Sequence, residues 1–184
     1  MIICAGEIEQ FVFARAVGIG MVDTAINLTK ICIEQRPDEI CFVGSAGSYG
    51  SHQIFDIIES SRAVNLENSF FNAQAYSPIE HNVSCETIDN DIIVNSSNYI
   101  TTDSSLAEAY LEKNIYLENM EFYAVMKVSQ VFDIPCRGIF VITNHCDADA
   151  HEAFLKNHPE AMKRLTEYIN PNNAIRDYQS PTDH

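Results

Sequence analysis

The segment VITNHCDADAH, residues 141–151, places amide, imidazole, thiol and carboxylate groups directly after an apolar run. Such groups could hold a metal, form part of an active site at the end of a strand, or cap a helix. Zinc sites usually need further ligands with HxxxH or CxxC spacing, and nothing upstream supplies them. We therefore expect no bound metal, and we assign Asp147 and Asp149 to capping of the helix that follows. Thr143 and Asn144 remain as candidates, because open α/β sheets bind ligands at the carboxyl ends of their strands.

Glu121 is a lone carboxylate at the start of an apolar helical segment, directly after Met120. On spacing alone it is a first-turn acid that the helix dipole favours. The functional alternative is a carboxylate that accepts hydrogen bonds from two neighbouring sugar hydroxyls, because both of its oxygens only accept. Met120 would then pack against the ribose.

Glycines gather in two places that could approach a ligand. The segment GSAGSYG, residues 44–50, follows a short strand and could offer backbone N–H groups to an anion or a sugar hydroxyl. It matches neither GxGxxG nor GxxxxGK[ST], so a tight glycine turn is the simpler interpretation. The segment GIG, residues 18–20, precedes a helix whose amino end would attract an anion.

The elements that must position these residues alternate between helix and strand. Helical spacing of apolar residues over 22–32 leads into the strand ICFVG, residues 40–44, and helical spacing over 120–128 leads, after Pro135, into the strand CRGIFVIT, residues 136–143. Two such units predict a mostly parallel sheet covered by helices. The text DIIES and DIIVN, residues 56–60 and 91–95, predicts further strands.

Two regions are less regular. Residues 64–90 are polar and receive no assignment, while residues 150–169 predict a helix whose second piece starts at Pro159. No linker, repeat or low-complexity segment argues for a second domain, so we expect a single domain over residues 1–184.

Composition excludes several classes of partner. The net charge is −15 and the pI about 4.6, so phosphate backbones and anionic membrane surfaces would repel the chain, and we expect neither nucleic acid nor a membrane as partner. No apolar run approaches the ~20 residues of a membrane helix and no leader segment is visible, which predicts a cytoplasmic protein. The six cysteines lack CxxC spacing and are expected to be reduced and mainly buried.

Three stretches together resemble the nucleoside phosphorylase family, which includes purine nucleoside phosphorylases and methylthioadenosine/S-adenosylhomocysteine nucleosidases. They are GIGMVDTAINLTKICIEQRPDEICFVGSAGSYG, DIIVNSSNYITTD and NMEFYAVMKVSQVFDIPCRGIFVITNHCDAD. The resemblance implies an α/β fold of three layers (αβα) with a central mixed sheet, a purine nucleoside substrate and cleavage of the bond between ribose and base. It implies no cofactor, with phosphate as a possible co-substrate, and a homo-oligomer, a dimer or larger. The stretch SFFNAQAY, residues 69–76, could serve an interface or the core.

The resemblance also assigns roles to single residues. Ser45 and Gly47 would line the side of the nucleophile or phosphate. Met120 and Glu121 would hold the ribose, and Tyr99 with Ile100 the base. Glu9 would take the position of the nucleosidases' water-activating glutamate, although Glu7 and Glu9 read equally well as solvated charges on a short turn.

The chain departs from the family at three points. Asn144 stands where nucleosidases have an aspartate, and an amide can donate a hydrogen bond to the leaving purine but cannot protonate it. Phe42 stands where hexameric phosphorylases have a phosphate-binding arginine, which favours water as the attacking group. The chain is also shorter than family members. We expect inosine or guanosine derivatives to be preferred over adenosine derivatives, and binding without efficient turnover is the alternative.

Overall fold

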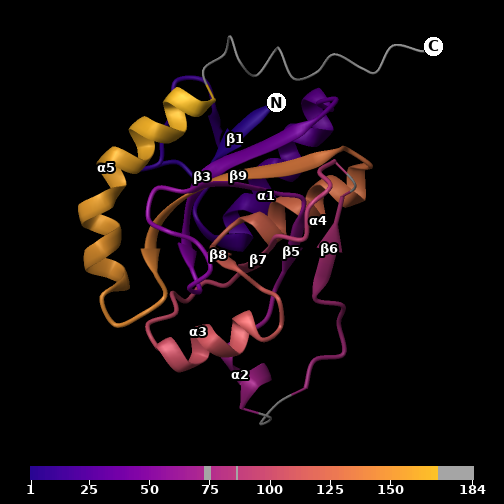
Figure 1. Cartoon of the computed structure of the whole chain (residues 1–184). Helices are drawn as coiled ribbons and strands as arrows, with labels where there is room; N and C mark the ends of the chain where they lie inside the picture. Colours follow the sequence, from indigo (N-terminus) through magenta and orange to yellow (C-terminus); the bar gives the residue numbers. More distant parts are fainter. Residues whose placement is uncertain (73–75, 86, 170–184) are drawn as a thin grey trace, which may run out of the picture.

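Nine strands form one mixed sheet in the computed structural model, which describes residues 1–72, 76–85 and 87–169 (Figure 1). Seven of them follow the order β2-β1-β3-β8-β7-β5-β6, while β9 pairs with β3 and β4. Five strand pairs are parallel, and the pairs β3–β8, β4–β9 and β5–β6 are antiparallel. The strands are β1 Ile2–Cys4, β2 Arg15–Ala16, β3 Ile40–Ser48, β4 Ile57–Ser60, β5 Arg62–Val64, β6 Asn82–Ser84, β7 Ile93–Ser96, β8 Leu117–Asn119 and β9 Cys136–His145.

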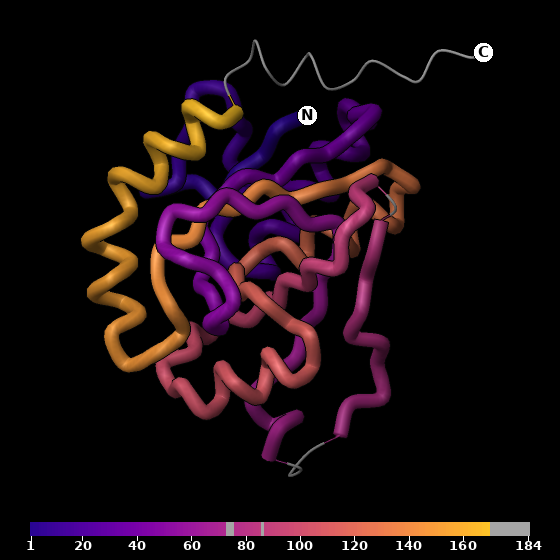
Figure 2. Tube along the Cα trace, in the orientation of Figure 1, coloured from indigo at the N-terminus to yellow at the C-terminus, as the bar shows by residue number. Residues whose placement is uncertain are grey.

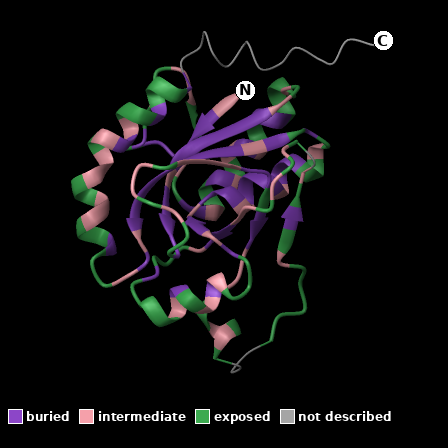
Figure 3. Ribbon diagram, viewed as in Figure 1, coloured by how far each residue is buried: buried purple, intermediate pink, exposed green. Residues whose placement is uncertain are grey.

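Helices cover both faces of this sheet. α1 and α4 pack against each other, α4 also contacts β5, β7 and β9, and α5 packs on β9 and β3 with a separate apolar cluster beneath it. The ribbons place α5 well apart from α1 and α4, and the strands between them are mostly buried (Figures 1 and 3). The helices are α1 Gly20–Gln35, α2 Asn68–Phe71, α3 Ser104–Leu111, α4 Phe122–Phe132 and α5 Ala150–Tyr168. The expected three-layer αβα fold with a mixed sheet is confirmed.

None of the helices in the described ranges is long and apolar enough to cross a membrane. The expected single domain over residues 1–184 stays a prediction, because residues 170–184 lie outside the described part of the chain.

β3 and β9 run side by side over almost their whole length, which corrects the predicted glycine turn. Their register pairs Ile40 with Cys136 at one end and Ser48 with His145 at the other, with a shift between Ala46 and Gly47. Most residues of the segment 44–48 are buried within β3 rather than in a turn. Ladder hydrogen bonds to β9 hold this glycine-containing text in a strand, and the turn comes only after Ser48.

The helix after β9 differs from the prediction in two details. α5 is continuous through Pro159, because Ala161 and Leu165 beyond it are buried against the sheet and offset the hydrogen bond that proline cannot donate. Asp149 occupies the N-cap position without a side-chain cap bond, whereas Asp147 accepts from the backbone N–H of Asp149 at 3.0 Å. Asp149 therefore stands at the predicted cap position without making the cap bond, whereas the capping role expected for Asp147 is wrong, because its side chain forms a local turn before the helix.

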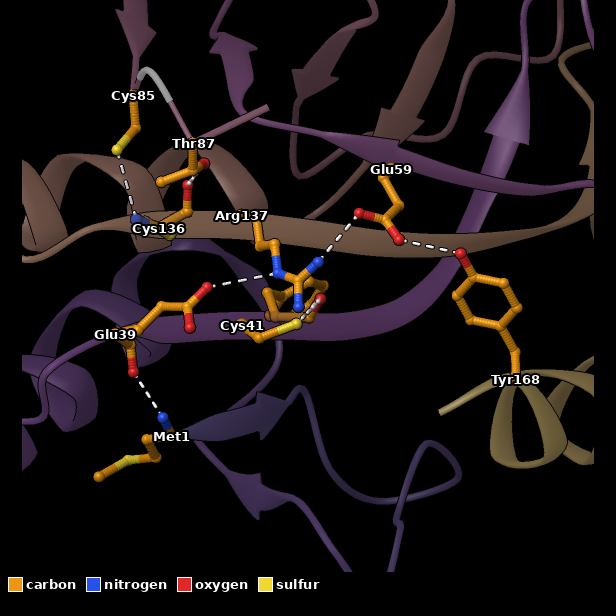
Figure 4. Close-up of polar contacts among 10 residues, drawn as sticks. Met1, Glu39, Cys41, Glu59, Cys85, Thr87, Cys136, Arg137 and Tyr168 are labelled. Atoms are coloured by element: carbon orange, nitrogen blue, oxygen red, sulfur yellow. Dashed lines mark hydrogen bonds and ion pairs between the residues drawn. The ribbon is translucent and has the colours of Figure 1, made fainter. Parts of the chain in front are cut away.

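A polar cluster closes the amino-terminal ends of β3 and β9, opposite the carboxyl ends (Figure 4). Arg137 lies between two carboxylates, with N–O distances of 3.1 Å to Glu59 and 3.4 Å to Glu39. The hydroxyl of Tyr168 donates to the other oxygen of Glu59 at 2.9 Å. This bond ties the last turn of α5 to β4.

All six cysteines are free, as expected, and all except the partly exposed Cys85 are buried. The Sγ atom of Cys85 accepts the backbone N–H of Cys136 at 3.4 Å (Figure 4). Burial raises the pKa of the Cys41 thiol to about 11, and it raises the pKa of the Cys136 and Cys146 thiols as well. These are inert core thiols in the native fold.

The irregular region after β5 contains only the short α2 and β6 within its described residues, and α2 lies beside α3 at one end of the molecule (Figure 2). In the stretch 69–76, residues 73–75 lie outside the described part. Phe71 packs edge-on against Tyr110 with ring centroids 4.6 Å apart, whereas Phe70 and Tyr76 are exposed. The stretch thus combines core and surface residues, and its use as an interface stays a prediction.

Candidate functional site

A cavity of about 250 Å³ opens where β3, β8 and β9 end, beside the loop that follows β1. The shift in register between Ala46 and Gly47 lies at this point, and the two strands stay paired beyond it, Gly47 with Asn144 and Ser48 with His145. The nine residues that the sequence proposed all line the cavity: Glu9, Ser45, Gly47, Tyr99, Ile100, Met120, Glu121, Thr143 and Asn144. The contacts of each residue indicate what it can do in the cavity.

Glu9 is buried and fixed by Ser45, whereas the neighbouring Glu7 is exposed. The backbone N–H of Ser45 donates to the two carboxylate oxygens of Glu9 at 3.2 and 3.3 Å, and the hydroxyl of Ser45 donates as well. A β-carbon on Gly44 would lie 2.8 Å from one of these oxygens, so a larger residue at position 44 would require the carboxylate to shift from this position. Burial raises the pKa of Glu9 above its ordinary value, partly offset by the bonds from Ser45. Such a carboxylate is a stronger base than an ordinary glutamate and is suited to accepting a proton.

Glu121 does not act as a first-turn acid of its own helix. It stands at the N-cap of α4 without a side-chain cap bond, and Asn119 Oδ1 instead accepts the N–H groups of Glu121 and Phe122, both at 2.9 Å. The carboxylate of Glu121 reaches across to α1, where it accepts the backbone N–H of Gly20 at 2.8 Å. The GIG segment does attract an anion at a helix amino end, and that anion is Glu121.

Burial, together with the negative charge of the nearby Glu9, raises the pKa of Glu121 to about 7, although the hydrogen bond from Gly20 opposes this rise. A raised pKa means that the folded state binds the proton more tightly than the unfolded state does. Stability from this group is therefore fully present below the ordinary glutamate pKa of about 4.5 and is lost as the pH rises to about 7.

The first prediction follows from this pKa. Between pH 4.5 and 7 the free energy of unfolding should fall less steeply for Glu121→Gln than for the wild type, by a total on the order of 3 kcal/mol, because glutamine does not titrate. Urea unfolding at several pH values measures this difference. Glu118 titrates in both proteins, and the part of the Glu9 titration that does not depend on the charge of Glu121 cancels in the comparison. Parallel pH profiles would show that Glu121 does not carry the shift.

Thr143 and Asn144 are held at the end of β9 by hydrogen bonds within the strand and by one bond from α5. The hydroxyl of Thr143 donates to Asn144 Oδ1 at 2.9 Å, and Asn144 Nδ2 donates to the carbonyl of His145 at 3.0 Å. Asn157 of α5 donates to the carbonyl of Thr143 at 2.8 Å. Both residues are buried, so the amide of Asn144 has a fixed orientation and one remaining N–H for a ligand.

Glu118, which the sequence analysis did not single out, is a third buried carboxylate in the cavity wall. It accepts the backbone N–H of Thr101 at 3.0 Å and the hydroxyl of Tyr49 at 3.1 Å. Burial raises its pKa, which these hydrogen bonds partly offset. An acid directly after the apolar Leu117, in the short segment YLEN, was the available signal for it.

Apolar and aromatic side chains form the mouth of the cavity. Tyr99 and Ile100 line it but are 82% and 51% exposed, and Met120 is partly exposed. Phe154 and His151, on the first turns of α5, complete the opposite wall. The sequence analysis missed Phe154, because it treated the segment after residue 150 only as a helix, and it considered His151 only as a possible metal ligand.

Basic groups are scarce around the cavity. No lysine or arginine among the described residues lines it, and His151 is its one basic side chain there. Phe42, to which the resemblance assigns the place of the arginine of hexameric phosphorylases, is fully buried in the core against Phe122 and Phe140. Within the described ranges, no group of three or more His, Cys, Asp or Glu residues is arranged to hold a metal ion.

Comparisons with known proteins agree with this architecture. A family model of the phosphorylase superfamily matches residues 2–170. A search of curated proteins gave no match. Among solved structures, the Helicobacter pylori 5′-methylthioadenosine/S-adenosylhomocysteine nucleosidase is 14% identical, with 94% of this chain and 96% of that chain covered and a TM-score of 0.78. The futalosine hydrolase of Helicobacter pylori strain 26695 is 15% identical, with coverage of 91% and 94% and a TM-score of 0.76.

A further solved structure is a Helicobacter pylori nucleosidase variant in which one aspartate is replaced by asparagine, with 5′-methylthioadenosine in the active site. It is 16% identical to this chain, covers 92% of it and 97% of its own chain, and has a TM-score of 0.72. At these identities the likeness concerns the fold.

Proposed function

This chain belongs to the phosphorylase superfamily, and from that membership we propose that it is a hydrolase that cleaves the N-glycosidic bond of a purine nucleoside with water. The nucleosidase-like fold supports cleavage of such a bond in general. One observation carries the finer proposal: the buried carboxylate of Glu9 lies in a cavity without any lining lysine or arginine in the described chain.

The charge of the cavity supports water over phosphate. Three buried carboxylates, Glu9, Glu118 and Glu121, line a space in which phosphate would bring further negative charge. Phosphate sites in proteins supply guanidinium, ammonium or several free backbone N–H groups. Here the N–H groups of Gly20 and Ser45 are already bound to glutamates. A neutral water molecule is not repelled by the three carboxylates in this way.

The proposed reaction assigns each group a task. Glu9 takes a proton from the water that attacks the anomeric carbon, and Ser45 keeps its carboxylate in place. Glu121 accepts hydrogen bonds from the ribose hydroxyls beside Met120, while its negative charge favours the oxocarbenium-like transition state. Asn144 donates its remaining N–H to the leaving base.

The second prediction tests the acceptor. Incubated with inosine, guanosine and adenosine, the protein should release free base and ribose at the same rate with and without phosphate, and no ribose 1-phosphate should form. Inosine or guanosine should be cleaved faster than adenosine, because an amide suits a keto purine better than a base that needs protonation. Chromatography of the products measures both. Product formed only with phosphate would replace hydrolysis by phosphorolysis.

A second function rests on Asn144. Since an amide cannot protonate a leaving purine, a protein of this fold could bind a nucleoside or purine with little or no turnover. The same incubation separates the two functions, because calorimetric binding without product would select this alternative.

We also propose that the chain forms a homo-oligomer, a dimer or larger, as its resemblance implies. Ile8, Tyr99 and Ile100 expose apolar surface at the cavity mouth, which supports a second chain as their cover.

A further inference from the structure

One edge of β3 is open at Ser45. Because β9 pairs with the opposite edge over the whole length of β3, β1 and β8 share this edge between them. β1 pairs with β3 at Cys41 and Phe42, before the gap. β8 pairs with it at Gly47 and Ser48, after the gap. No described strand therefore pairs with Ser45 on this edge, and side chains must supply the hydrogen-bond partners that its backbone needs inside the protein.

Two side chains fill this gap from opposite sides. Glu9 accepts the backbone N–H of Ser45 at 3.2 and 3.3 Å, and Asn119 Nδ2 donates to the carbonyl of Ser45 at 3.0 Å. Asn119 is the last residue of β8, is buried and lines the cavity. Its side chain continues the link between β8 and β3 one residue beyond their last backbone pair, which joins Glu118 to Gly47.

The same amide holds the start of α4. Asn119 Oδ1 accepts the backbone N–H groups of Glu121 and Phe122, both at 2.9 Å, which is the bonding pattern of a helix N-cap. An amide can do both because its acceptor and its donor are separate atoms. Asn119 thus links Ser45, which fixes the carboxylate of Glu9, to the backbone of Glu121. The proposed hydrolysis uses both glutamates at once and gives Asn119 no task.

We propose that Asn119 is a positioning residue that sets the separation between the carboxylates of Glu9 and Glu121. This inference rests on the proposed hydrolysis, in which Glu9 activates the water and Glu121 holds the ribose that this water attacks. An error in their separation misplaces the water relative to the anomeric carbon, so it slows the chemical step more than it weakens nucleoside binding. Asn119 acts through the backbone of Ser45 and Glu121 rather than on the substrate.

The third prediction concerns Asn119→Ser. Serine is a favourable N-cap residue and keeps the start of α4, but its short hydroxyl does not also reach the carbonyl of Ser45. The value of kcat for nucleoside hydrolysis should fall at least about tenfold, since a misplacement of about 1 Å can cost about a hundredfold in rate. KM should change less than about threefold, because the ribose contact is kept. Steady-state kinetics measure both, and a higher KM with unchanged kcat would overturn the inference.

Asn90→Ser is the matched control. Asn90 makes the same pair of bonds, since it accepts the backbone N–H of Ile92 at 3.2 Å and donates to the carbonyl of Glu59 at 3.0 Å, but it does not line the cavity. This variant should keep the wild-type kcat. An equal loss of kcat in both variants would mean that any broken amide link slows the enzyme, and Asn119 would have no positioning role. If Asn119→Ser does not fold, Asn119→Thr takes its place, because threonine is also a favourable N-cap residue.

A double variant separates positioning from general weakening of the fold. In a Glu9→Gln background, Asn119→Ser should lower kcat less than about twofold, because the base that Asn119 positions has already been removed. A loss by the same factor in both backgrounds would show that Asn119 does not act through Glu9, which contradicts the inference.

A titration tests the link without relying on activity. The hydrogen bonds from Ser45 lower the pKa of Glu9, so releasing Ser45 in Asn119→Ser should raise that pKa above its wild-type value, whereas Asn90→Ser should leave it unchanged. Carbon-13 NMR of labelled glutamate carboxyl groups measures it, with the Glu9 signal assigned through Glu9→Gln. An unchanged Glu9 pKa would refute the link even in an active enzyme. If the wild type cleaves no nucleoside, the proposed hydrolysis fails, and this titration alone decides the role of Asn119.

Discussion

Glu9→Gln is expected to lower kcat for nucleoside hydrolysis by two to four orders of magnitude, the usual contribution of a general base. Glutamine has nearly the same shape and keeps an oxygen that can accept from Ser45, but it cannot take a proton from water. Nucleoside affinity, measured by calorimetry, should change less than about fivefold, since the lost group acts in the transition state.

The neighbouring Glu7→Gln is a matched control, because Glu7 lies exposed on the same loop and does not line the cavity. It should keep wild-type activity. If Glu9→Gln also turns over at the wild-type rate, or if both variants lose activity to the same extent, Glu9 is not the base.

Glu121→Ala is expected to weaken nucleoside binding at least a hundredfold, because it removes the acceptor that we assign to the ribose hydroxyls. It should also destabilise the fold by about 1 to 3 kcal/mol, since the buried N–H of Gly20 loses its partner. A carboxylate that only favoured its own helix dipole would cost about 0.3 to 1 kcal/mol. Calorimetry and urea unfolding measure the two effects.

Glu121→Gln serves as the control for stability, because its amide oxygen can still accept from Gly20. The sugar provides a second control. Wild type should strongly prefer a ribonucleoside over its 2′,3′-dideoxy analogue, and Glu121→Ala should bind both about equally. A preference that survives in the alanine variant would place the ribose hydroxyls elsewhere.

The sequence predicted those elements of the fold that have a local pattern of apolar residues. β3 and β9 contain apolar runs that are typical of buried strands, and the helix before each strand shows helical spacing of its apolar residues. The sequence analysis missed α3, although Asp103 is a favourable N-cap residue for this helix. The Asp103 side chain accepts hydrogen bonds from the backbone N–H groups of Ser105 and Leu106. β8 has only three residues and owes its existence to β3 and β7 on either side, which no local pattern reveals.

The sequence predicted which residues line the cavity, but it did not predict which groups these residues contact. Resemblance supplied Glu9 and Glu121, but their binding partners lie 36 and 101 residues away in the chain, at Ser45 and Gly20. Glu118 is buried because distant strands meet around it. Such burial depends on tertiary pairing, so a single sequence does not show which carboxylates lose water and gain a raised pKa.

The six free cysteines can report on local unfolding of the native chain. Cys85 is the one accessible in part in the native protein, whereas Cys4, Cys32, Cys41, Cys136 and Cys146 lie in strands, in α1 or just after β9, and are closed off by the core. Alkylation of these five must wait for an opening event, so its rate in native buffer measures how often each element opens. Mass spectrometry of partly alkylated protein would then rank the sheet, α1 and the segment after β9 by local stability, without any engineered residue.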